Sequence, residues 1–416
     1  MMPLHDNISQ AETQVFVWDR PHPAETVDRV LEHKKLLGLT RLADITRLDR
    51  IGIPVVLSVR PGASYLSVDT GKGITLDHSR ASAAMECVER FCGENAKFET
   101  WWSDYETCAI SHNPLPKNLL PLSKNSLFNA RLPFEWTEVA DYVSGELIAI
   151  PAEILALDRP KRTLSETLPF QSSSNGLSAG NTMDEALFGG LCELIERDAL
   201  ALMWGVWNQG IATPPRIDLE AITSTLSPVT QSLLKLSDQA GVETIVFDCT
   251  QDIDVPVFMA YMIDHHTPEF GLFRGYGCHL DPEMAVQRAI TEAAQGRLVH
   301  IAGSRDDMFG HKRTNGRSLF IAGANAITDV KPTCALRARD IKAPANPKQG
   351  VNYLINKIKA TGLRHILVQD LTWPSIGIPA VRVLIPGLEG YMFETYAPGK
   401  RALNAIELAK DQKVYH

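Results

Sequence analysis

The chain has 416 residues, of which 44% are hydrophobic and 22% charged, and its formal net charge is −8. This length allows one large domain or two to three packed subdomains, and the composition is that of a globular protein rather than a disordered or fibrous one. The negative charge, without any dense run of lysine and arginine, argues against nucleic acid or an anionic membrane as a partner. No uncharged run approaches the ~20 residues of a membrane-spanning helix, and no signal sequence is evident, so we expect a cytoplasmic location.

Seven cysteines are scattered through the sequence and never form a C-x-x-C pair. This spacing supports neither a disulfide framework nor a zinc site, so most of them should be small buried hydrophobes. Cys192 stands beside Glu193, and a neighbouring carboxylate disfavours a thiolate. The sequence therefore argues against Cys192 as a catalytic nucleophile.

The first part of the chain is predicted to be a lead-in that contains one helix. Residues 1–22 show no regular pattern, whereas 23–37 carry apolar residues at helical spacing. Gly38 follows this stretch and predicts the end of the helix.

A strand, a glycine-rich segment and a helix then recur three times. The first predicted unit has strands at 51–60 and 64–68, a turn at 71–73 and a helix at 79–91. The second has a strand at 148–156, a loop at 172–182 and a helix at 183–203. The third has a strand at 257–263, a glycine-rich passage at 271–277 and a helix at 282–302. Further strands are predicted at 244–247, 365–368 and 378–384, further helices at 223–240, 351–361 and 402–409, and long polar loops at 103–122 and 307–340. Because strands and helices do not alternate regularly, we predict the α+β class.

Two of the predicted helices carry the same pattern, Glu-x-x-Glu-Arg, at 86–90 and at 193–197. Residues three apart on an α-helix point about 60° apart, so the two glutamates of each copy share one face. Glu185 falls on the same face as Glu196, because eleven residues make about three full turns. The second helix is therefore predicted to carry a stripe of three acids.

The other side of that second helix is apolar, so neighbouring elements should enclose most of it. Its apolar residues are Leu187, Leu191, Leu194 and Ile195, and the small pair Gly189-Gly190 would let another backbone come close. Like-charged carboxylates in such a place lose hydration and repel one another, at roughly several kcal/mol each, unless a cation compensates. Oxygen ligands without histidine favour Mg²⁺ over Zn²⁺, and protein-bound Mg²⁺ commonly carries a phosphate.

The residues ahead of this helix suit such a phosphate. Polar and backbone donors precede a helix N-terminus, where anions are favoured, at Ser178, Gly180, Asn181 and Thr182. The guanidinium groups of Arg197 and Arg297 could bind further phosphate oxygens. The sequence thus favours a magnesium-nucleotide site without a Walker loop.

Plainer interpretations stay open for the same residues. Glu-x-x-Glu-Arg on a surface helix is commonly a solvated face with local ion pairs, and Asn181-Thr182 alone is an ordinary helix cap. The stretch 71–73 lacks the G-x-x-x-x-G-K-[ST] frame, so we interpret it as a turn. The isolated His78, His279 and His300 are taken as structural.

The assembled motifs resemble those of the YcaO family. Residues 172–198 resemble its signature, 71–75 with 85–91 its earlier motif, and 291–297 its later one. The resemblance covers roughly residues 50 to 390. It implies a YcaO-like fold in which repeated strand, glycine-rich loop and helix units surround a central nucleotide site.

The resemblance also implies a division of the chain into three parts. These are an N-terminal helical lead-in at 1–50, a catalytic domain at 51–390 that is open to subdivision, and a C-terminal tail at 391–416.

The activity implied by the resemblance is phosphorylation of a backbone amide oxygen in a peptide or protein, with ATP and Mg²⁺. The phosphorylated amide is then open to attack at its carbonyl carbon, because phosphate is a good leaving group. By motif position the metal ligands or their supports are Glu86, Glu89, Glu185, Glu193 and Glu196. The residues assigned to catalysis are Glu193, Glu196 and Arg197, and those assigned to the nucleotide are Ser178, Asn181, Glu185, Arg197, Gln295 and Arg297. A further nucleotide contact near the N-terminus is assigned to Arg20 or Thr26.

Members of the family differ in product. Some form azolines from Cys, Ser or Thr side chains and often end in a proline-rich tail, whereas the last proline here is Pro398. The start of the chain resembles the branch that forms thioamides beside TfuA-type partners. We therefore expect thioamide formation by a homodimer, with a TfuA-like partner and a separate leader-recognition protein. The alternatives are an azoline-forming cyclodehydratase and a non-catalytic, nucleotide-binding accessory or scaffold protein.

Overall fold

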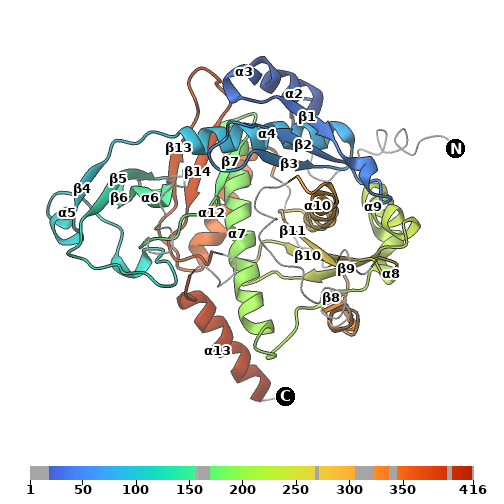
Figure 1. The fold of residues 1–416 in the computed structure, drawn as a ribbon. Coiled ribbons are helices and arrows are strands. Elements are labelled where there is room, and N and C mark those ends of the chain that lie inside the picture. Colours follow the sequence, from blue (N-terminus) through green and yellow to red (C-terminus); the bar gives the residue numbers. More distant parts are fainter. Residues whose placement is uncertain are drawn as a thin grey trace. The chain divides into compact units, whose positions relative to one another are not determined.

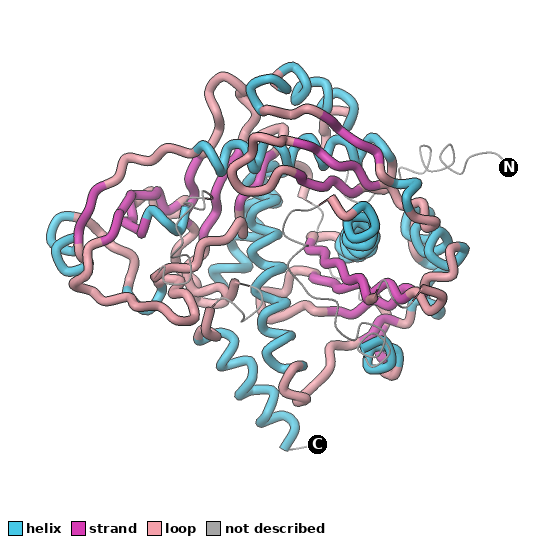
Figure 2. Tube along the Cα trace, in the orientation of Figure 1, coloured by secondary structure: helices cyan, strands magenta, loops and turns pink. Residues whose placement is uncertain are grey.

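A computed structural model describes residues 18–155, 157, 169–267, 271–304, 323–336, 344–390 and 396–414 (Figure 1). The chain forms two compact units, each from two separate stretches of sequence: Met1–Cys87 with Thr213–Gly350, and Val88–Ala212 with Val351–His416. Both units combine helices and sheets, so the predicted α+β class is confirmed (Figure 2). The three-part division at residues 50 and 390 stays a prediction.

The first unit contains two sheets. The smaller has the order β1-β2-β3 and is antiparallel, with β1 at Arg41–Asp44, β2 at Val55–Val59 and β3 at Val68–Lys72. The larger has the order β11-β10-β9-β8-β12, with β8 at Arg216–Ile217, β9 at Glu243–Asp248, β10 at Val257–Ile263, β11 at Leu272–Cys278 and β12 at Pro332–Cys334. The helices of this first unit are α2 (Pro23–Glu32), α3 (Lys34–Leu37), α8 (Leu219–Ile222), α9 (Pro228–Gln239) and α10 (Pro282–Ala302), with 3-10 turns at Thr46–Leu48 and Thr223–Thr225.

The second unit is built on a six-stranded sheet of order β4-β5-β13-β14-β7, in which β6 also pairs with β5. Its strands are β4 (Trp101–Ser103), β5 (Phe134–Asp141), β6 (Leu147–Pro151), β7 (Leu177–Ala179), β13 (Leu367–Asp370) and β14 (Ala380–Leu384). Its helices are α5 (Tyr105–Ser111), α6 (Ala152–Leu155), α7 (Met183–Trp207) and α13 (Lys400–Val414), with a 3-10 turn at Lys117–Leu119. Two further helices, α4 (Leu76–Asn95) and α12 (Pro347–Ala360), contain the boundaries between the units.

Helix α10 lies against β11 at very short range (Figure 1). A Cβ added at Gly275 would lie 2.2 Å from the backbone nitrogen of Ala293, and one added at Gly277 would lie 2.0 Å from the backbone oxygen of Ala285. Glycine on the strand and alanine on the helix therefore permit backbone-to-backbone packing that larger residues would prevent.

The same packing occurs between β3 and α4, where a Cβ on Gly71 would lie 2.1 Å from the backbone nitrogen of Ala83. This corrects two predictions. The stretch 71–73 is not simply a turn, because Gly71 and Lys72 belong to β3, and the passage 271–277 is mostly strand β11. In both places the glycine is needed for the close approach of a helix and not for a bend.

Other boundaries differ from the predictions for local reasons. The helix predicted at 23–37 is broken at His33, whose φ of −101° and ψ of 9° are not helical. The strand predicted at 64–68 begins only at Val68, and the loop predicted at 172–182 contains β7. The loop predicted at 103–122 contains α5. Most of the loop predicted at 307–340 lies outside the described residues, and so do 1–17, 156, 391–395 and 415–416.

The C-terminal helix α13 is bonded to α7 through a buried ion pair. Asp198 is fully buried, and its carboxylate accepts hydrogen bonds from Arg401 Nε at 2.9 Å and Arg401 Nη2 at 2.7 Å. Asp198 also accepts a bond from the backbone nitrogen of Glu389 at 2.9 Å. Glu389 in turn accepts from the backbone nitrogens of Gly399 and Ala402, both at 3.0 Å, at the start of α13. One buried aspartate thus joins α7, the turn after β14 and the last helix.

Six of the seven cysteines are buried and all seven are free thiols, which confirms the expectation that most are small core residues. Burial raises the pKa of the Cys108 thiol to about 11. His279 is buried as well, and loss of hydration lowers its pKa to about 3, in keeping with a structural role. Among the described helices, none combines the length and the apolar character that crossing a bilayer requires.

We expect Gly275→Ala to lower the free energy of unfolding by about 1–3 kcal/mol, because the added methyl group meets the backbone of α10 and not a flexible side chain. Urea unfolding followed by circular dichroism measures the change. Gly62→Ala is the matched control, since a Cβ at Gly62 has no atom within 4 Å. Equal unfolding midpoints for the two variants would contradict close packing between α10 and β11.

We expect Asp198→Asn to destabilise the protein by about 3–5 kcal/mol, because it leaves the Arg401 guanidinium without its buried carboxylate. Glu106→Gln is the control, since it breaks an exposed ion pair with Lys117 that should contribute about 1 kcal/mol or less. The measurement is again the midpoint of urea unfolding. If both substitutions shift it equally, the buried pair does not hold α13 in place.

Candidate functional site

Helix α7 carries most of the predicted site residues, and its N-terminus is formed by local hydrogen bonds. The hydroxyl of Thr182 accepts a bond from the backbone nitrogen of Glu185 at 3.2 Å, so the helix-cap interpretation of Thr182 is confirmed. The carboxylate of Glu185 accepts a bond from the backbone nitrogen of Asn181 at 3.0 Å. The structure thus brings Asn181 and Glu185 together at the first turn.

Ser178, in β7, lies directly beside α7. A Cβ added at Gly189 would be 2.5 Å from the Ser178 hydroxyl oxygen, and one at Gly190 would be 3.0 Å from a methyl group of Val383. The prediction that this glycine pair lets another chain segment approach the helix is confirmed. Strands β7 and β14 are the elements that do so.

Glu193, Glu196 and Arg197 form one cluster. Both carboxylates approach the Arg197 guanidinium: an oxygen of Glu193 lies 3.5 Å from Nη2, and an oxygen of Glu196 lies 3.5 Å from Nη1. The other oxygen of Glu193 accepts a hydrogen bond from the backbone nitrogen of Gly176 at 3.0 Å. Both ion pairs are long compared with a tight hydrogen bond, so the guanidinium balances the acids without binding either of them closely.

The apolar side of α7 faces the core, as predicted. The four residues expected there are each 8% exposed or less: Leu187, Leu191, Leu194 and Ile195. The side chain of Glu196 is only 9% exposed, and that of Glu193 is 28% exposed. This cluster is therefore not the fully solvated helix face that was the plainer interpretation of the pattern.

The first copy of the pattern lies on α4, where Glu86 and Glu89 are both half-buried. The boundary between the units falls between Cys87 and Val88, so the two glutamates belong to different units. Convergence of these acids with those of α7 stays a prediction.

Gln295 and Lys72 join α10 to β3. The side-chain nitrogen of Gln295 donates to the backbone oxygen of Thr70 at 2.6 Å and to its hydroxyl at 2.7 Å. Lys72 forms an ion pair with Glu292 one turn earlier on α10. The role of Gln295 as a nucleotide contact stays a prediction, and the Lys72–Glu292 pair is a contact that sequence reasoning missed.

Arg297 is 1% exposed and lies between two carboxylates. Its Nε is 2.7 Å from Asp49, and its Nη2 is 3.0 Å from Asp264. Loss of hydration raises the pKa of Asp264, but hydrogen bonds from Thr267, the charge of Arg297 and a hydrogen bond from Arg50 outweigh this effect and bring the pKa to about 2. The Asp264 carboxylate is therefore ionised at neutral pH. The nucleotide contact assigned to Arg297 stays a prediction beside this structural role.

The sequence did contain a sign of this burial. Arg297 continues a stripe of buried residues spaced by four along α10, after Ala285, Ala289 and Ala293. A charged residue at such a position predicts a buried partner, because an unpaired charge there would be costly. Asp198 shows the same sign on α7, four residues after Leu194.

The acid cluster suits Mg²⁺ by its donor chemistry. Within the described ranges, no three His, Cys, Asp or Glu side chains gather as a ready-made metal site. Glu193 and Glu196 nevertheless reach the same guanidinium, so their oxygens can also reach one common cation, and oxygen is the donor that Mg²⁺ prefers. These two residues fit a magnesium ion within the second unit.

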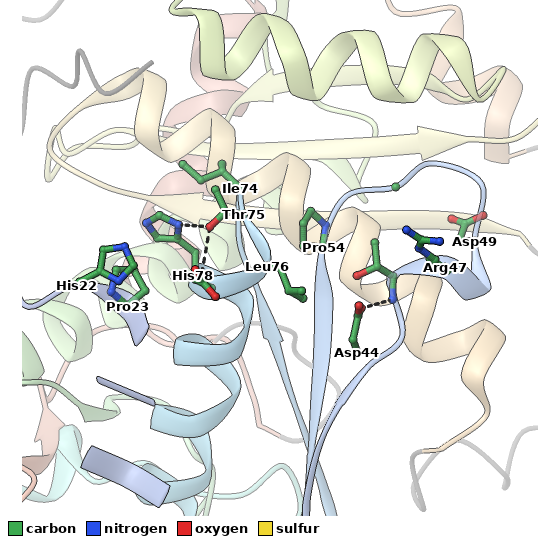
Figure 3. A pocket seen from close by; sticks show the side chains of 13 residues that line it. His22, Pro23, Asp44, Arg47, Asp49, Pro54, Ile74, Thr75, Leu76 and His78 are labelled. Carbon is green, nitrogen blue, oxygen red and sulfur yellow. Dashed lines mark hydrogen bonds between the residues drawn. The ribbon is translucent and has the colours of Figure 1, made fainter. Parts of the chain in front are cut away.

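A cavity of about 590 Å³ lies in the first unit, between the start of α2, the segment after β1 and the start of α4. Figure 3 shows the hydrogen bonds between Thr75 and His78, at 2.7 Å, and between Asp44 and the backbone of Thr46, at 2.9 Å. The predicted motif 71–75 contributes Ile74 and Thr75 to its lining, but no residue assigned to metal, nucleotide or catalysis lines it.

Comparison with known proteins places these features in a family. The model of the family described as YcaO cyclodehydratase, ATP- and Mg²⁺-binding, matches residues 70–389. An uncharacterized protein of Methanothermobacter thermautotrophicus is 31% identical over 393 residues, which cover 92% of this chain and 98% of the relative. An uncharacterized protein in the tfuA 3′ region of Rhizobium leguminosarum bv. trifolii is 32% identical over 408 residues, which cover 93% of each chain.

Two solved structures are similar over most of the chain. YcaO from Methanopyrus kandleri, bound with AMPPCP and Mg²⁺, is 25% identical with a TM-score of 0.69, and the match covers 91% of this chain and 95% of that one. A heterocyclase in complex with substrate and cofactor has a TM-score of 0.73 at 21% identity, and the match covers 92% of this chain and 55% of that one, which shows a shared fold. The predicted fold is thus confirmed, and so are ATP and Mg²⁺ as ligands of this type of domain. The chain belongs to the YcaO family.

Proposed function

We propose that this chain is an enzyme that uses ATP to phosphorylate a backbone amide oxygen of a peptide or protein, after which sulfide attacks the carbonyl carbon and a thioamide forms. The observation that carries the proposal is the match to an ATP- and Mg²⁺-binding family over residues 70–389, with Glu193, Glu196 and Arg197 gathered in one cluster. A scaffold protein without turnover would have no need of two acids gathered at one guanidinium.

The reaction balances in two steps. The amide oxygen attacks the γ-phosphorus of ATP, the bond to the leaving ADP breaks, and the amide nitrogen loses its proton. Hydrosulfide then adds to the carbonyl carbon, and phosphate leaves with the original oxygen. The nitrogen regains a proton and the carbon keeps sulfur in place of oxygen.

The residues of this chain would act through charge and position. Glu193 and Glu196 would hold the magnesium ion, which when bound neutralises charge on the phosphate groups. Arg197 lies between them and can donate to the oxygens of the transferring phosphoryl group, where negative charge must be stabilised. Ser178 and Asn181 precede the N-terminus of α7, whose dipole favours an anion.

Thioamide formation is supported by a relative that is 32% identical over nearly the whole of both chains and is encoded in a tfuA 3′ region. We accordingly propose a cytoplasmic homodimer with a TfuA-like partner, a separate leader-recognition protein and a peptide or protein substrate. Azoline formation is the second candidate, because the family is described as cyclodehydratases.

We expect Glu193→Gln and Glu196→Gln each to lower peptide-dependent ATP hydrolysis by a factor of about 10² or more, because each removes a negative charge from the metal site. Release of phosphate, measured with and without peptide substrate, gives the rate. Glu407→Gln is the matched control, since Glu407 is an exposed glutamate on α13. Wild-type protein that hydrolyses no ATP in the presence of substrate would instead support the scaffold alternative.

We expect the product, after reaction with ATP, Mg²⁺, sulfide and the TfuA-like partner, to be heavier than the substrate by the difference between sulfur and oxygen. Mass spectrometry of the peptide measures this directly, and chelation of Mg²⁺ with EDTA should abolish the change. Loss of one water per modification without any need for sulfide would point to azoline formation and refute the thioamide assignment.

A further inference from the structure

A cavity of about 550 Å³ lies within the second unit, close to α7. Its walls come from the loop at 115–126, from β14 with the turn after it, and from the start of α13. This volume is within the range of sites that enclose a small ligand or a few residues of peptide. Any role of this cavity in holding a peptide rests on the proposed function.

The floor of the cavity is apolar and firmly packed. Five aliphatic residues of the lining belong to the hydrophobic core of the sheet: Leu115, Leu120, Ile150, Ile154 and Leu367. Leu194 of α7 lines the cavity beside them. The loop above this floor is fixed to the chain at 169–171, because Gln171 donates its backbone nitrogen to Pro121 and Ser126 donates its hydroxyl to Pro169, both at 2.7 Å. The floor can therefore receive aliphatic side chains without rearranging.

The charged lining of the cavity is mostly positive. Its cations are Lys117, Lys124, Arg382 and Lys400. Glu389 is the one acid among the described lining residues, and its carboxylate already accepts two backbone bonds at the start of α13. Lys117 is paired with Glu106 outside the lining. Arg382 is buried and already donates to the backbone oxygens of Ile154 and Ser173, so the exposed Lys124 and Lys400 are the cations that favour a ligand with carboxylates.

The cavity is separated from the acid cluster by a single short segment of chain. Ser173 and Asn175 line the cavity, and the next residue, Gly176, donates its backbone nitrogen to Glu193. The amide of Asn175 holds the backbone oxygen of Gly390 at 2.8 Å, and Gly390 donates to the hydroxyl of Tyr396 at 2.7 Å. A ligand in the cavity would therefore lie one loop away from the residues assigned to the magnesium ion.

We propose that this cavity binds an extended acidic segment of the peptide substrate, with aliphatic side chains on the floor and a carboxylate between Lys124 and Lys400. The side-chain amides of Asn118, Gln171 and Asn175 line the same cavity and suit hydrogen bonding to a peptide backbone. Binding here holds the neighbouring part of the substrate close to Glu193, so that an amide outside the cavity reaches the site of phosphoryl transfer.

Binding without ATP tests this proposal directly. The probe is a short fluorescein-labelled peptide of leucine, valine and glutamate, and its partner probe has glutamine in place of every glutamate. We expect wild-type protein to bind the acidic probe at least about tenfold more tightly in low salt, by fluorescence anisotropy, and this preference to fall as salt rises. Equal affinity for the two probes would overturn the proposal.

Substitutions in the lining test whether the probe binds in this cavity. We expect the double variant Lys124→Glu with Lys400→Glu to lose at least about tenfold in affinity for the acidic probe, because the charge of the lining is reversed. Lys235→Glu with Lys410→Glu is the matched control, since both are exposed lysines away from the cavity and the net charge changes equally. Leu119→Gln should weaken both probes, because it places a polar group in the apolar part of the lining. An equal loss in the control double variant would show nonspecific charge attraction and refute the cavity as the site.

The outcomes for cavity and function can be told apart. Specific binding of the acidic probe without any thioamide or azoline product would keep the cavity and refute the enzyme. Product formed by the Lys124→Glu and Lys400→Glu variant, with the same KM for an acidic substrate as the wild type, would keep the enzyme and refute the cavity.

Discussion

The close packing of long helices against strands is the constraint on which the rest of the structure depends. At α10 and β11 the glycines are on the strand and the alanines on the helix, whereas at α7 and β7 the glycines are on the helix, with Ser178 against Gly189. The first arrangement brings two backbones together, the second places the Ser178 side chain against the helix, and both fix how the helix is rotated. Because the rotation is fixed, the polar residues of each helix face one set direction. The helix itself places the two carboxylates beside one guanidinium, and its packing fixes the direction in which they face.

The charges of α7 are compensated separately on different sides of the helix. Arg197 lies among Glu193 and Glu196, while the adjacent Asp198 points to Arg401 and the backbone of Glu389. Four charged residues therefore stand within six positions of a largely buried helix, and two of them, Glu193 and Glu196, share the single positive charge of Arg197. The two sets of ion pairs differ in geometry. The contacts of Arg197 are long and adaptable, whereas the Asp198–Arg401 pair is short and buried. The first arrangement suits a ligand that replaces or adds to a contact, and the second suits a permanent joint.

The sequence predicts those features of the fold whose cause lies within the same short segment of chain. The helix predicted at 282–302 is found as Pro282–Ala302, because Asp281 caps it, Pro282 occupies its first turn, and Gly303 ends it with φ of 59°, all of which are signals within the segment. Gly71, in contrast, was assigned to a turn, because its reason for being glycine is a helix that the local sequence does not reveal. Strand β5 was missed entirely. Among the site residues, the grouping of Glu193 with Glu196 followed from helix periodicity. Asp49, a partner of Arg297, and Arg401, the partner of Asp198, are 248 and 203 residues away in sequence, and only the fold brings them together.

The C-terminal helix α13 is connected to Glu193 through the chain segments between them, although none of its own residues is assigned to the site. Glu389 connects the start of α13 to Asp198, and the following Gly390 is held by Asn175, whose neighbour Gly176 donates to Glu193. The links in this series are hydrogen bonds and peptide bonds between adjacent residues, so the start of α13 is connected to the segment that orients Glu193. The cationic cavity is formed by the same turn, segment and helix. By the proposed function, a peptide held against this wall would also help to orient Glu193, one of the acids assigned to the magnesium ion.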